Sequence, residues 1–413
     1  MSSYRTVATV QATRKDFKPF HTRISTAAHL LSTEQHGFLP KRSTITQLLL
    51  TINTWMNSTE SKSTTDIIYT DLSKAFDKVS HSKLLEVLTS YGISGNIKGW
   101  IKCFLEERIQ YVQVNNNMSS PATVYSGVPQ GSVLGPLLFL LYIDDSSKTC
   151  SANTSMCLFA DDTKIFSSIP DELQISLDEL TNFYFRRQLD LSVEKCEKLT
   201  IPKSPSSRLF SIGDVTLPEV PFVKDLGIYI KGDLKWDVHI SKIKIKANQR
   251  AYLILKSFQT KDVWLLLKAY LTFVRPITEY GCVVWNPYLQ KDIASIEAVQ
   301  RSFTKKLCNR CNIPYTSYEH RLNMLNIRSL EYRRLETDLI MTYKILHKLI
   351  DIPIHDFFTM YSSQYNTRRH RFCLQAKRVC SNFQQNSFKN RVVSIWNKLP
   401  DKIVEAKTLP IFK

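Results

Sequence analysis

Short apolar runs rich in β-branched and aromatic residues predict strands in the first half of the chain. Ile67-Ile68-Tyr69-Thr70 leads into Asp71, and two further runs, at 156–160 and 163–166, flank the pair Asp161-Asp162. Apolar runs separated by a short polar turn are typical of a β-hairpin. The pattern therefore predicts strand, tight turn and strand, with both aspartates at the tip.

A strand that ends at Asp71 beside this hairpin would bring three carboxylates together. Clustered carboxylates repel one another unless a cation is present, and hard divalent ions such as Mg²⁺ prefer oxygen ligands. Two such ions about 3.5–4 Å apart are the usual machinery for in-line displacement at phosphorus. Because Asp also favours turns for local reasons, the hypothesis depends on Asp71 meeting the pair.

Helical patterns separate the strands. An apolar run at 45–55 predicts one helix, and Ser82 is predicted to cap another that Gly92 ends. Three glycines and two prolines define a loop at 126–136, followed by a helix at 137–143 with a proline in its first turn. Because glycine lets a backbone approach a ligand closely, this loop is a candidate contact for a base or phosphate; the alternative is a plain connector.

From about residue 231 the apolar positions recur at helical spacing and the chain becomes basic. No acidic residue occurs at 239–256, nor between Asp356 and Asp401. Basic residues interleaved with aromatic ones suit nucleic-acid contact, since charges bind phosphate and rings stack on bases. The alternative is that the aromatics are core and the charges a solvated face. The basic candidates are Lys242, Lys244, Lys246, Arg250, Arg368 and Arg369.

Composition supports a polyanionic partner. The 413 residues carry a net charge of +18, from 55 basic and 37 acidic residues, although a merely soluble basic protein is the alternative. A hydrophobic content of 43% argues against bulk disorder. Residues 1–20 lack a signal-peptide core, and the longest apolar run, 133–143, is well short of the ~20 residues of a membrane helix, so no membrane association is expected. The nine scattered cysteines fit a reducing compartment, and Cys308 and Cys311 have metal-ligand spacing without a second pair, which favours ordinary thiols over zinc.

Four motifs, in this order, closely resemble those of the reverse transcriptases of non-LTR (LINE-type) retrotransposons, particularly the jockey-like group. They are Gly37-Phe38 with Arg42-Ser43, the segment Asp71 to Asp77, the segment Gly127 to Ser132, and Phe159 to Asp162. The likeness continues through Lys195-Cys196 and 223–227 into the tail at 280–285 and 328–334. It covers nearly the whole chain and implies an α+β right-hand polymerase. Such a fold has a palm with an antiparallel sheet and packed helices, partial fingers, a helical thumb and a C-terminal helical region.

The resemblance implies a division of the chain into four parts. These are partial fingers at 1–63, the palm with finger elements at 64–230, a helical thumb-like region at 231–330 and a basic C-terminal region at 331–413. The chain starts within what looks like the family's fingers, without an upstream endonuclease or a downstream ribonuclease H motif. We therefore expect an N-terminally truncated product that performs only the extension step of the element's cycle.

The resemblance also assigns the metal site. Asp71 and Asp161 would bridge two Mg²⁺ ions, with Mn²⁺ as an alternative, Leu72 would lend its backbone carbonyl, and Asp162 would complete the site less directly. Lys195 stands where the family places a basic residue that could protonate the departing pyrophosphate. The alternative for Lys195 is a surface lysine.

Further implied roles concern the nucleotide. The Phe76 ring would block a ribose 2′-hydroxyl and favour deoxynucleotides, the alternative being a core phenylalanine. Gln130 would lie against the incoming nucleotide beside Gly131. Arg42 would reach its phosphates, since a forked guanidinium suits them, with Lys41 as a rival.

The turn at 223–227, with Lys224 and Gly227, would grip the primer end. The implied function is an RNA-directed DNA polymerase that extends a primer 3′-hydroxyl with dNTPs. Its partners would be an RNA template and a DNA primer or target, met in the nucleus, the cytoplasm or both. Two alternatives are a catalytically inactive nucleic-acid-binding remnant and a two-metal nuclease; the nuclease explains neither Phe76 nor the loop at 126–136.

Overall fold

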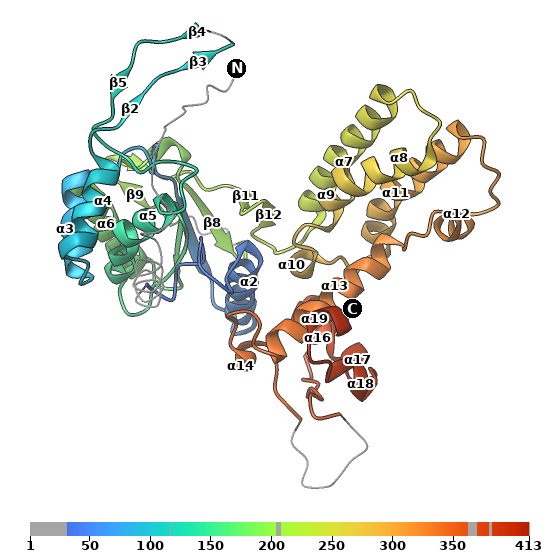
Figure 1. Ribbon diagram of the computed structural model, residues 1–413. Helices are drawn as coiled ribbons and strands as arrows, with labels where there is room; N and C mark the ends of the chain where they lie inside the picture. Colours follow the sequence, from blue (N-terminus) through green and yellow to red (C-terminus); the bar gives the residue numbers. More distant parts are fainter. Residues whose placement is uncertain (1–30, 116, 204–207, 362–369, 380–381, 413) are drawn as a thin grey trace. The chain divides into compact units, whose positions relative to one another are not determined.

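The computed structural model describes residues 31–115, 117–203, 208–361, 370–379 and 382–412 (Figure 1). The predicted nucleic-acid contacts Arg368 and Arg369 lie outside these residues. Internal contacts divide the chain into two compact units. The first contains residues 1–44 and 63–220, and the second contains residues 45–62 and 221–413.

A four-stranded antiparallel sheet forms the centre of the first unit, in the order β6-β7-β1-β8. Ile68 of β1 pairs with Ile165 of β7, and both side chains are fully buried. A one-residue slip would turn these apolar positions to the other face, so burial specifies the register. The sheet confirms the hairpin predicted around Asp161-Asp162 and the α+β class. The strands are β1 (Thr65–Thr70), β6 (Ser155–Phe159), β7 (Asp162–Ser167) and β8 (Glu197–Ile201).

Helices cover one face of this sheet (Figure 1). Buried leucines of α3, α5 and α6 join the apolar side chains of β1, β6 and β7 in one core. As predicted, α5 carries a proline in its first turn, and Leu138 to Ile143 are all buried. The helical segments are α3 (His81–Ser90), α4 (Gly95–Leu105), α5 (Gly135–Ile143) and α6 (Pro170–Arg186), with 3₁₀ segments η2 (Asp144–Thr149) and η3 (Val193–Lys195).

The predicted cap of α3 is wrong by two residues. The helix begins at His81, and Ser80, with an extended backbone, occupies the N-cap position. Ser82 therefore lies in the first turn, with its hydroxyl 3.2 Å from that of Ser80. Apolar spacing identifies the buried face of a helix but does not decide which of two nearby serines has the non-helical backbone.

Short strands complete the first unit. Between α4 and α5 the chain forms an extended ribbon that projects from the helices, in which β2 pairs with β5 and β3 with β4 (Figure 1). Its strands are β2 (Ile109–Gln110), β3 (Gln113–Val114), β4 (Asn117–Met118) and β5 (Ala122–Thr123). A separate small hairpin is formed by β9 (Ser211–Ile212) and β10 (Val215–Thr216).

The second unit is mainly helical. One apolar cluster joins α7, α8 and α11, where the Tyr270 and Phe303 rings stack with centroids 4.6 Å apart. A hairpin of β11 (Phe222–Asp225) and β12 (Ile228–Lys231) precedes these helices. The helices are α2 (Thr44–Glu60), α7 (Asp237–Ser257), α8 (Val263–Phe273), α9 (Arg275–Glu279), α10 (Cys282–Trp285), α11 (Gln290–Arg310), α12 (Tyr318–Met324), α13 (Leu330–Leu346), α14 (Ile354–Phe357), α15 (Asn382–Gln385), α16 (Phe388–Arg391), α17 (Val393–Trp396), α18 (Asp401–Val404) and α19 (Leu409–Phe412).

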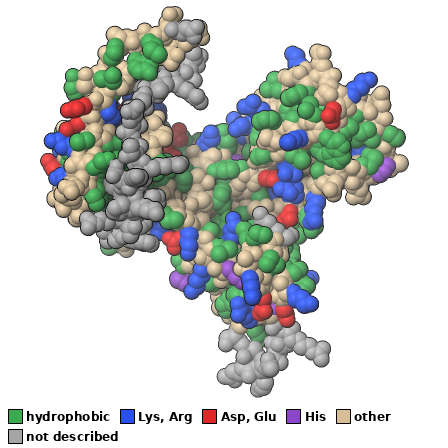
Figure 2. All heavy atoms as spheres, viewed as in Figure 1, with side chains coloured by type: hydrophobic (Ala, Val, Ile, Leu, Met, Phe, Trp, Pro, Cys, Tyr) green, Lys and Arg blue, Asp and Glu red, His purple; other side chains and the backbone are tan. Residues whose placement is uncertain are grey.

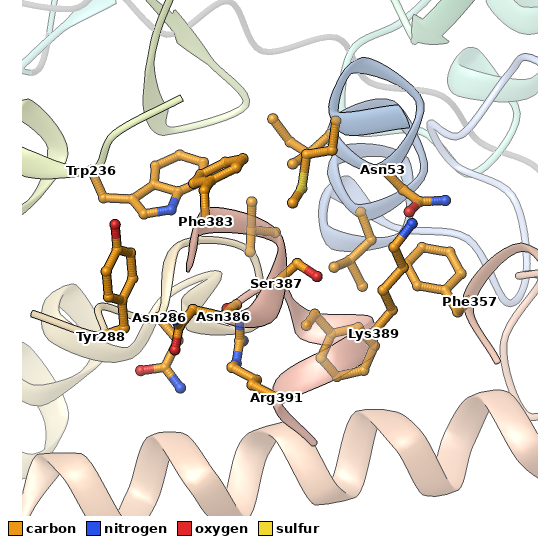
Figure 3. A pocket seen from close by; sticks show the side chains of 15 residues that line it. Asn53, Trp236, Asn286, Tyr288, Phe357, Phe383, Asn386, Ser387, Lys389 and Arg391 are labelled. Carbon is orange, nitrogen blue, oxygen red and sulfur yellow. Dashed lines mark hydrogen bonds between the residues drawn. The ribbon is translucent and has the colours of Figure 1, made fainter. Parts of the chain in front are cut away.

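Helix α2 packs against segments that follow it by some 300 residues. Asn53 donates to the Asp356 carbonyl at 3.1 Å, and Lys389 donates to Asn57 at 2.8 Å. Figure 3 shows side chains of α2 facing Phe383 and Lys389 around a cavity of about 40 Å³. A site for one water molecule needs roughly 10–15 Å³ by this measure, so the cavity has room for only a few water molecules. Its size is that of a gap in the packing.

Trp396, on α17, is fully buried. The core interpretation of the C-terminal aromatics is thus confirmed for that residue. In the described part of the chain, no helix combines the length and apolar character needed to cross a membrane.

Candidate active site

The turn between β6 and β7 carries the predicted aspartates. Phe159 pairs with Asp162, which leaves Ala160 and Asp161 as the two turn residues. Ala160 has a φ of +56°, a backbone conformation that a hairpin turn often gives to glycine. Asp162 begins β7 and is exposed. The tip therefore presents Asp161, half-buried, next to the sheet.

Asp71 follows the neighbouring strand and is close to Asp161. Strand β1 ends at Thr70, which pairs with Thr163 just beyond the turn. Burial and the nearby charge of Asp71 raise the pKa of the Asp161 carboxyl above its usual value. The two predicted metal ligands thus lie near enough to repel each other when both are ionised.

A lysine is bonded to Asp71. Lys195 Nζ donates to Asp71 Oδ2 at 2.8 Å, and this bond raises the pKa of Lys195. Backbone pairing explains how Lys195 arrives there: Ser192 N–H donates to the Asp71 carbonyl and Ser73 N–H to the Asp190 carbonyl, each at 2.8 Å. The short helix η3 then carries Lys195 to the carboxylate.

Two of the three predicted carboxylates come together. Across the described ranges, no group of three or more His, Cys, Asp or Glu side chains is arranged to hold a metal ion, and the less direct role of Asp162 stays a prediction. Asp71 and Asp161 nevertheless fit a divalent cation. Their mutual repulsion is relieved by positive charge, and carboxylate oxygens are the ligands that Mg²⁺ prefers.

The glycine-rich loop packs directly on the segment that follows Asp71. Val128 N–H donates to the Phe76 carbonyl at 2.9 Å, and Gln130 Nε2 donates to Asp77 Oδ1 at 3.0 Å. Gly127 has a φ of +85°, and a Cβ there would lie 2.7 Å from the Asp77 carbonyl oxygen. The structure therefore brings Phe76, Gln130 and the neighbouring Gly131 into one region of the first unit.

Phe76 is half-buried. Its ring stacks on Phe139 with centroids 4.3 Å apart, and the exposed Phe38 meets it edge-on at 6.3 Å. One side of the ring thus belongs to the core. Its role as a barrier to the 2′-hydroxyl stays a prediction.

The predicted phosphate contacts lie in the loop before α2. Arg42 Nη1 donates to the carbonyls of Ser32, Thr33 and Gln35 at 3.2, 2.9 and 2.6 Å. This nitrogen therefore stabilises the conformation of the loop at 32–42. Lys41, with a φ of +62°, is exposed. Contact of either side chain with phosphate stays a prediction.

In the second unit, the β11–β12 hairpin contains the predicted primer-gripping turn. Leu226 and Gly227 both have positive φ, 44° and 89°, as a type I′ turn requires. The Tyr280 hydroxyl donates to the Leu226 carbonyl at 2.9 Å and supports the turn. Lys224 is exposed on β11.

Helix α7 presents the predicted basic residues. Lys242, Lys246 and Arg250 are exposed and follow one another at four-residue spacing, so they share one face, while Lys244 is half-buried. The adjacent face of the helix buries Ile243 and other apolar side chains. Figure 2 shows basic side chains over this helical part of the second unit.

Two residues beside the Asp161 turn were not predicted. Gln35 accepts the Ala160 N–H at 3.0 Å, and the fully buried Tyr184 has its hydroxyl 3.0 Å from that of Thr163. Burial raises the pKa of Tyr184 to about 12, so it stays neutral beneath the turn. The only signal for Gln35 is its place two residues before the Gly37-Phe38 motif; Tyr184 lies on an amphipathic helix with no distinguishing pattern.

Comparison with known proteins defines the class. Residues 1–253 match the family model described as reverse transcriptase (RNA-dependent DNA polymerase), and the chain belongs to this family. It is 24% identical over 323 residues to the probable RNA-directed DNA polymerase from transposon X-element of Drosophila melanogaster, covering 74% of this chain and 35% of that protein. It is also 24% identical over 290 residues to the RNA-directed DNA polymerase from mobile element jockey of the same species, covering 66% of this chain and 31% of that protein.

The resemblance to non-LTR retrotransposon enzymes is thereby confirmed. The chain spans about a third of the length of these relatives. Among solved structures, the apo telomerase of Candida tropicalis aligns with a TM-score of 0.44 and 12% identity, over 82% of this chain and 59% of that one.

Proposed function

We propose that this chain is an RNA-directed DNA polymerase that extends the 3′-hydroxyl of a DNA primer with deoxynucleoside triphosphates on an RNA template. The observation that carries the proposal is the approach of Asp71 to the Asp161 turn, where two carboxylates repel each other beside an exposed lysine. The membership of the chain in the reverse transcriptase family supports it.

Two Mg²⁺ ions, or Mn²⁺ in their place, would supply the acidity that activates the primer hydroxyl and the charge that neutralises the triphosphate. Asp71 and Asp161 would hold the ions. The Leu72 backbone carbonyl would be a further ligand, and Asp162 would complete the site less directly. Lys195 occupies Oδ2 of Asp71, so a cation that bound this oxygen would compete with the lysine. Competition at that oxygen would turn its ammonium towards the triphosphate, where it could protonate the leaving pyrophosphate.

Other residues of the first unit would select the incoming deoxynucleotide. Gln130 and Gly131 would contact the nucleotide, and Phe76 would exclude ribose. Arg42 or Lys41 would bind its phosphates. Primer contact would come from Lys224 and Gly227 of the β11–β12 hairpin, and template or product contact from the basic face of α7.

The test is primer extension by the purified chain on an RNA template with a DNA primer, dNTPs and Mg²⁺. Asp161→Asn and Asp71→Asn should each lower the rate by at least about 10³-fold, which corresponds to about 4 kcal/mol of barrier. Binding of the RNA–DNA substrate should be retained. Extension that persists in the double variant contradicts the assignment, and binding without extension by the wild type indicates a nucleic-acid-binding protein without turnover.

A further inference from the structure

A glutamine from the start of the described chain holds the catalytic turn. Gln35 is 1% exposed, and its Oε1 accepts the backbone N–H groups of Ala160 at 3.0 Å and Gly37 at 2.7 Å. Ala160 directly precedes Asp161 and is 5% exposed. A single side-chain oxygen thus joins two buried backbone donors that are more than 120 residues apart in the chain.

The segment around Gln35 lies along β6, the edge strand of the sheet. Leu158 N–H donates to the Glu34 carbonyl at 2.9 Å, and His36 N–H donates to the Leu158 carbonyl at 2.7 Å. These bonds form a parallel bridge between Gln35 and Leu158. The segment is therefore fixed in register with the strand that leads into the turn.

The turn itself is strained and needs such support. Ala160 has a φ of +56°, a region that costs a residue with a side chain roughly 1–2 kcal/mol. Strained backbone of this kind persists only where the surroundings over-determine it. Contact is close as well, because a Cβ at Gly37 would lie 2.5 Å from the Ala160 nitrogen.

The same segment is bonded to the predicted phosphate-binding loop. The Gln35 carbonyl accepts from Arg42 Nη1 at 2.6 Å. The side chain of Gln35 thus bonds the Asp161 turn while its backbone bonds Arg42. Gln35 thus contacts both the Asp161 turn and the loop that carries Arg42.

We propose that Gln35 is a positioning residue that fixes the Asp161 turn relative to Asp71, and so sets the affinity of the site for a divalent cation. The inference rests on the proposed function, because it assigns that cation to Asp71 and Asp161. Partners that orient metal ligands in this way typically contribute 10–100-fold to affinity. Gln35 touches neither substrate nor metal in this scheme and acts on the proposed cation site through its bond to Ala160.

The test is direct Mn²⁺ binding to the full chain, measured by electron paramagnetic resonance without nucleotide, with Asp161→Asn defining binding at other sites. Gln35→Met keeps the length of the side chain and removes the acceptor, and should weaken Mn²⁺ binding about 10–100-fold. Gln35→Glu retains an acceptor oxygen and should stay within about threefold of the wild type, which is less than about 0.7 kcal/mol. Thermal unfolding of each variant reports whether it is folded.

The matched control is Gln174→Met. Gln174, on α6, bonds the backbone of Ser211 through both its amide oxygen and its amide nitrogen, at 3.1 and 2.9 Å. Its loss should lower stability without changing Mn²⁺ affinity. If Gln35→Met fails to fold, Gly37→Ala replaces it, since the added methyl presses on the Ala160 nitrogen.

The outcomes separate the two proposals. Unchanged Mn²⁺ affinity in folded Gln35→Met or Gly37→Ala overturns the positioning role. A wild type that binds Mn²⁺ through Asp161 in a Gln35-dependent manner but never extends a primer supports the positioning role and contradicts the polymerase. A wild type that binds no more Mn²⁺ than Asp161→Asn overturns both.

Discussion

A half-buried carboxylate beside a second carboxylate is costly to ionise, and Asp161 is in that position. Its pKa in the folded chain is raised, so the folded state binds its proton more tightly than the unfolded state does. Without metal, stability from this residue is therefore greatest at acid pH. It is lost as the pH rises from the ordinary carboxyl value of 3.8 through the raised value.

Asp161→Asn should accordingly stabilise the metal-free chain at neutral pH while it abolishes the proposed activity. In EDTA at pH 7 we expect the Tm of the variant to exceed that of the wild type. The difference should vanish at acid pH, where the wild-type carboxyl is protonated. Scanning fluorimetry from pH 4 to 8 measures it.

Added Mg²⁺ should make the wild type more stable than Asp161→Asn, because a ligand stabilises only the protein that binds it. The control is Asp214→Asn, an exposed aspartate in the β9–β10 turn that should show neither effect. A metal-free Asp161→Asn chain less stable than the wild type at neutral pH would mean that contacts within the protein stabilise the ionised carboxylate.

At the scale of the element, the loop at 126–136 acts through its packing. Ser126 Oγ donates to the Asp77 carbonyl at 2.8 Å, and Gly127 leaves no room for a side chain against the same group. The loop therefore holds the Phe76–Asp77 segment from one side, while Gln130 bonds the Asp77 carboxylate. The loop can therefore be a structural connector and also a candidate nucleotide contact, and the two alternatives considered for it are compatible.

Comparing Gly127→Ala with Gly213→Ala separates the backbone strain of a positive φ from the effect of moving the loop. Gly127→Ala should destabilise the chain by about 1–3 kcal/mol and raise the KM for dNTPs, because the loop must move away from Asp77. Gly213→Ala is the matched control, with a φ of +58° and no atom within 4 Å of the added methyl. It should cost about 1 kcal/mol and leave the KM unchanged. Denaturant unfolding and steady-state kinetics give both quantities, and equal KM values in the two variants would exclude the loop from nucleotide binding.

Sequence patterns predicted the elements that depend on neighbours in the chain. The β6–β7 hairpin and the proline-led α5 follow from local alternation and turn chemistry, whereas the turn at 223–227 is implied by the family resemblance. Gln35 could not be found in this way, because its bond to Ala160 joins residues 125 apart and no periodicity encodes it. Likewise, pairing through Asp190 and Ser192 decides that Lys195 meets Asp71.

At the scale of the whole molecule, charge is distributed unevenly along the chain. The surplus of +18 includes the run at 239–256, which has no acidic residue, and α7 displays part of it on one exposed face. Basic side chains in a row release counterions when they bind phosphates, which makes affinity steeply dependent on salt. Helix α7 is therefore the proposed contact for the RNA–DNA duplex.

The triple variant Lys242→Ala/Lys246→Ala/Arg250→Ala should weaken duplex binding. It should also reduce the slope of log K against log salt by about 2–3, close to 0.9 per lost phosphate contact. The control triple is Lys291→Ala/Lys305→Ala/Lys306→Ala on α11, where all three lysines are exposed. Electrophoretic mobility shifts from 50 to 300 mM salt measure the slope for each triple variant. Equal slopes would mean that α7 contributes only to the net charge and makes no specific phosphate contacts.

Helix α2 is among the first helices that a ribosome would release, yet its native neighbours are among the last. Asp356, which receives its Asn53 bond, emerges 303 residues later. At about 5–20 residues per second this is a wait of roughly 15–60 s. During that time the apolar side of α2, including Leu49, Ile52 and Met56, lacks the aromatic partners of α15 and α16. A nascent chain with such an unpaired surface is a natural client for chaperones, and slower translation after residue 220 would prolong its exposure.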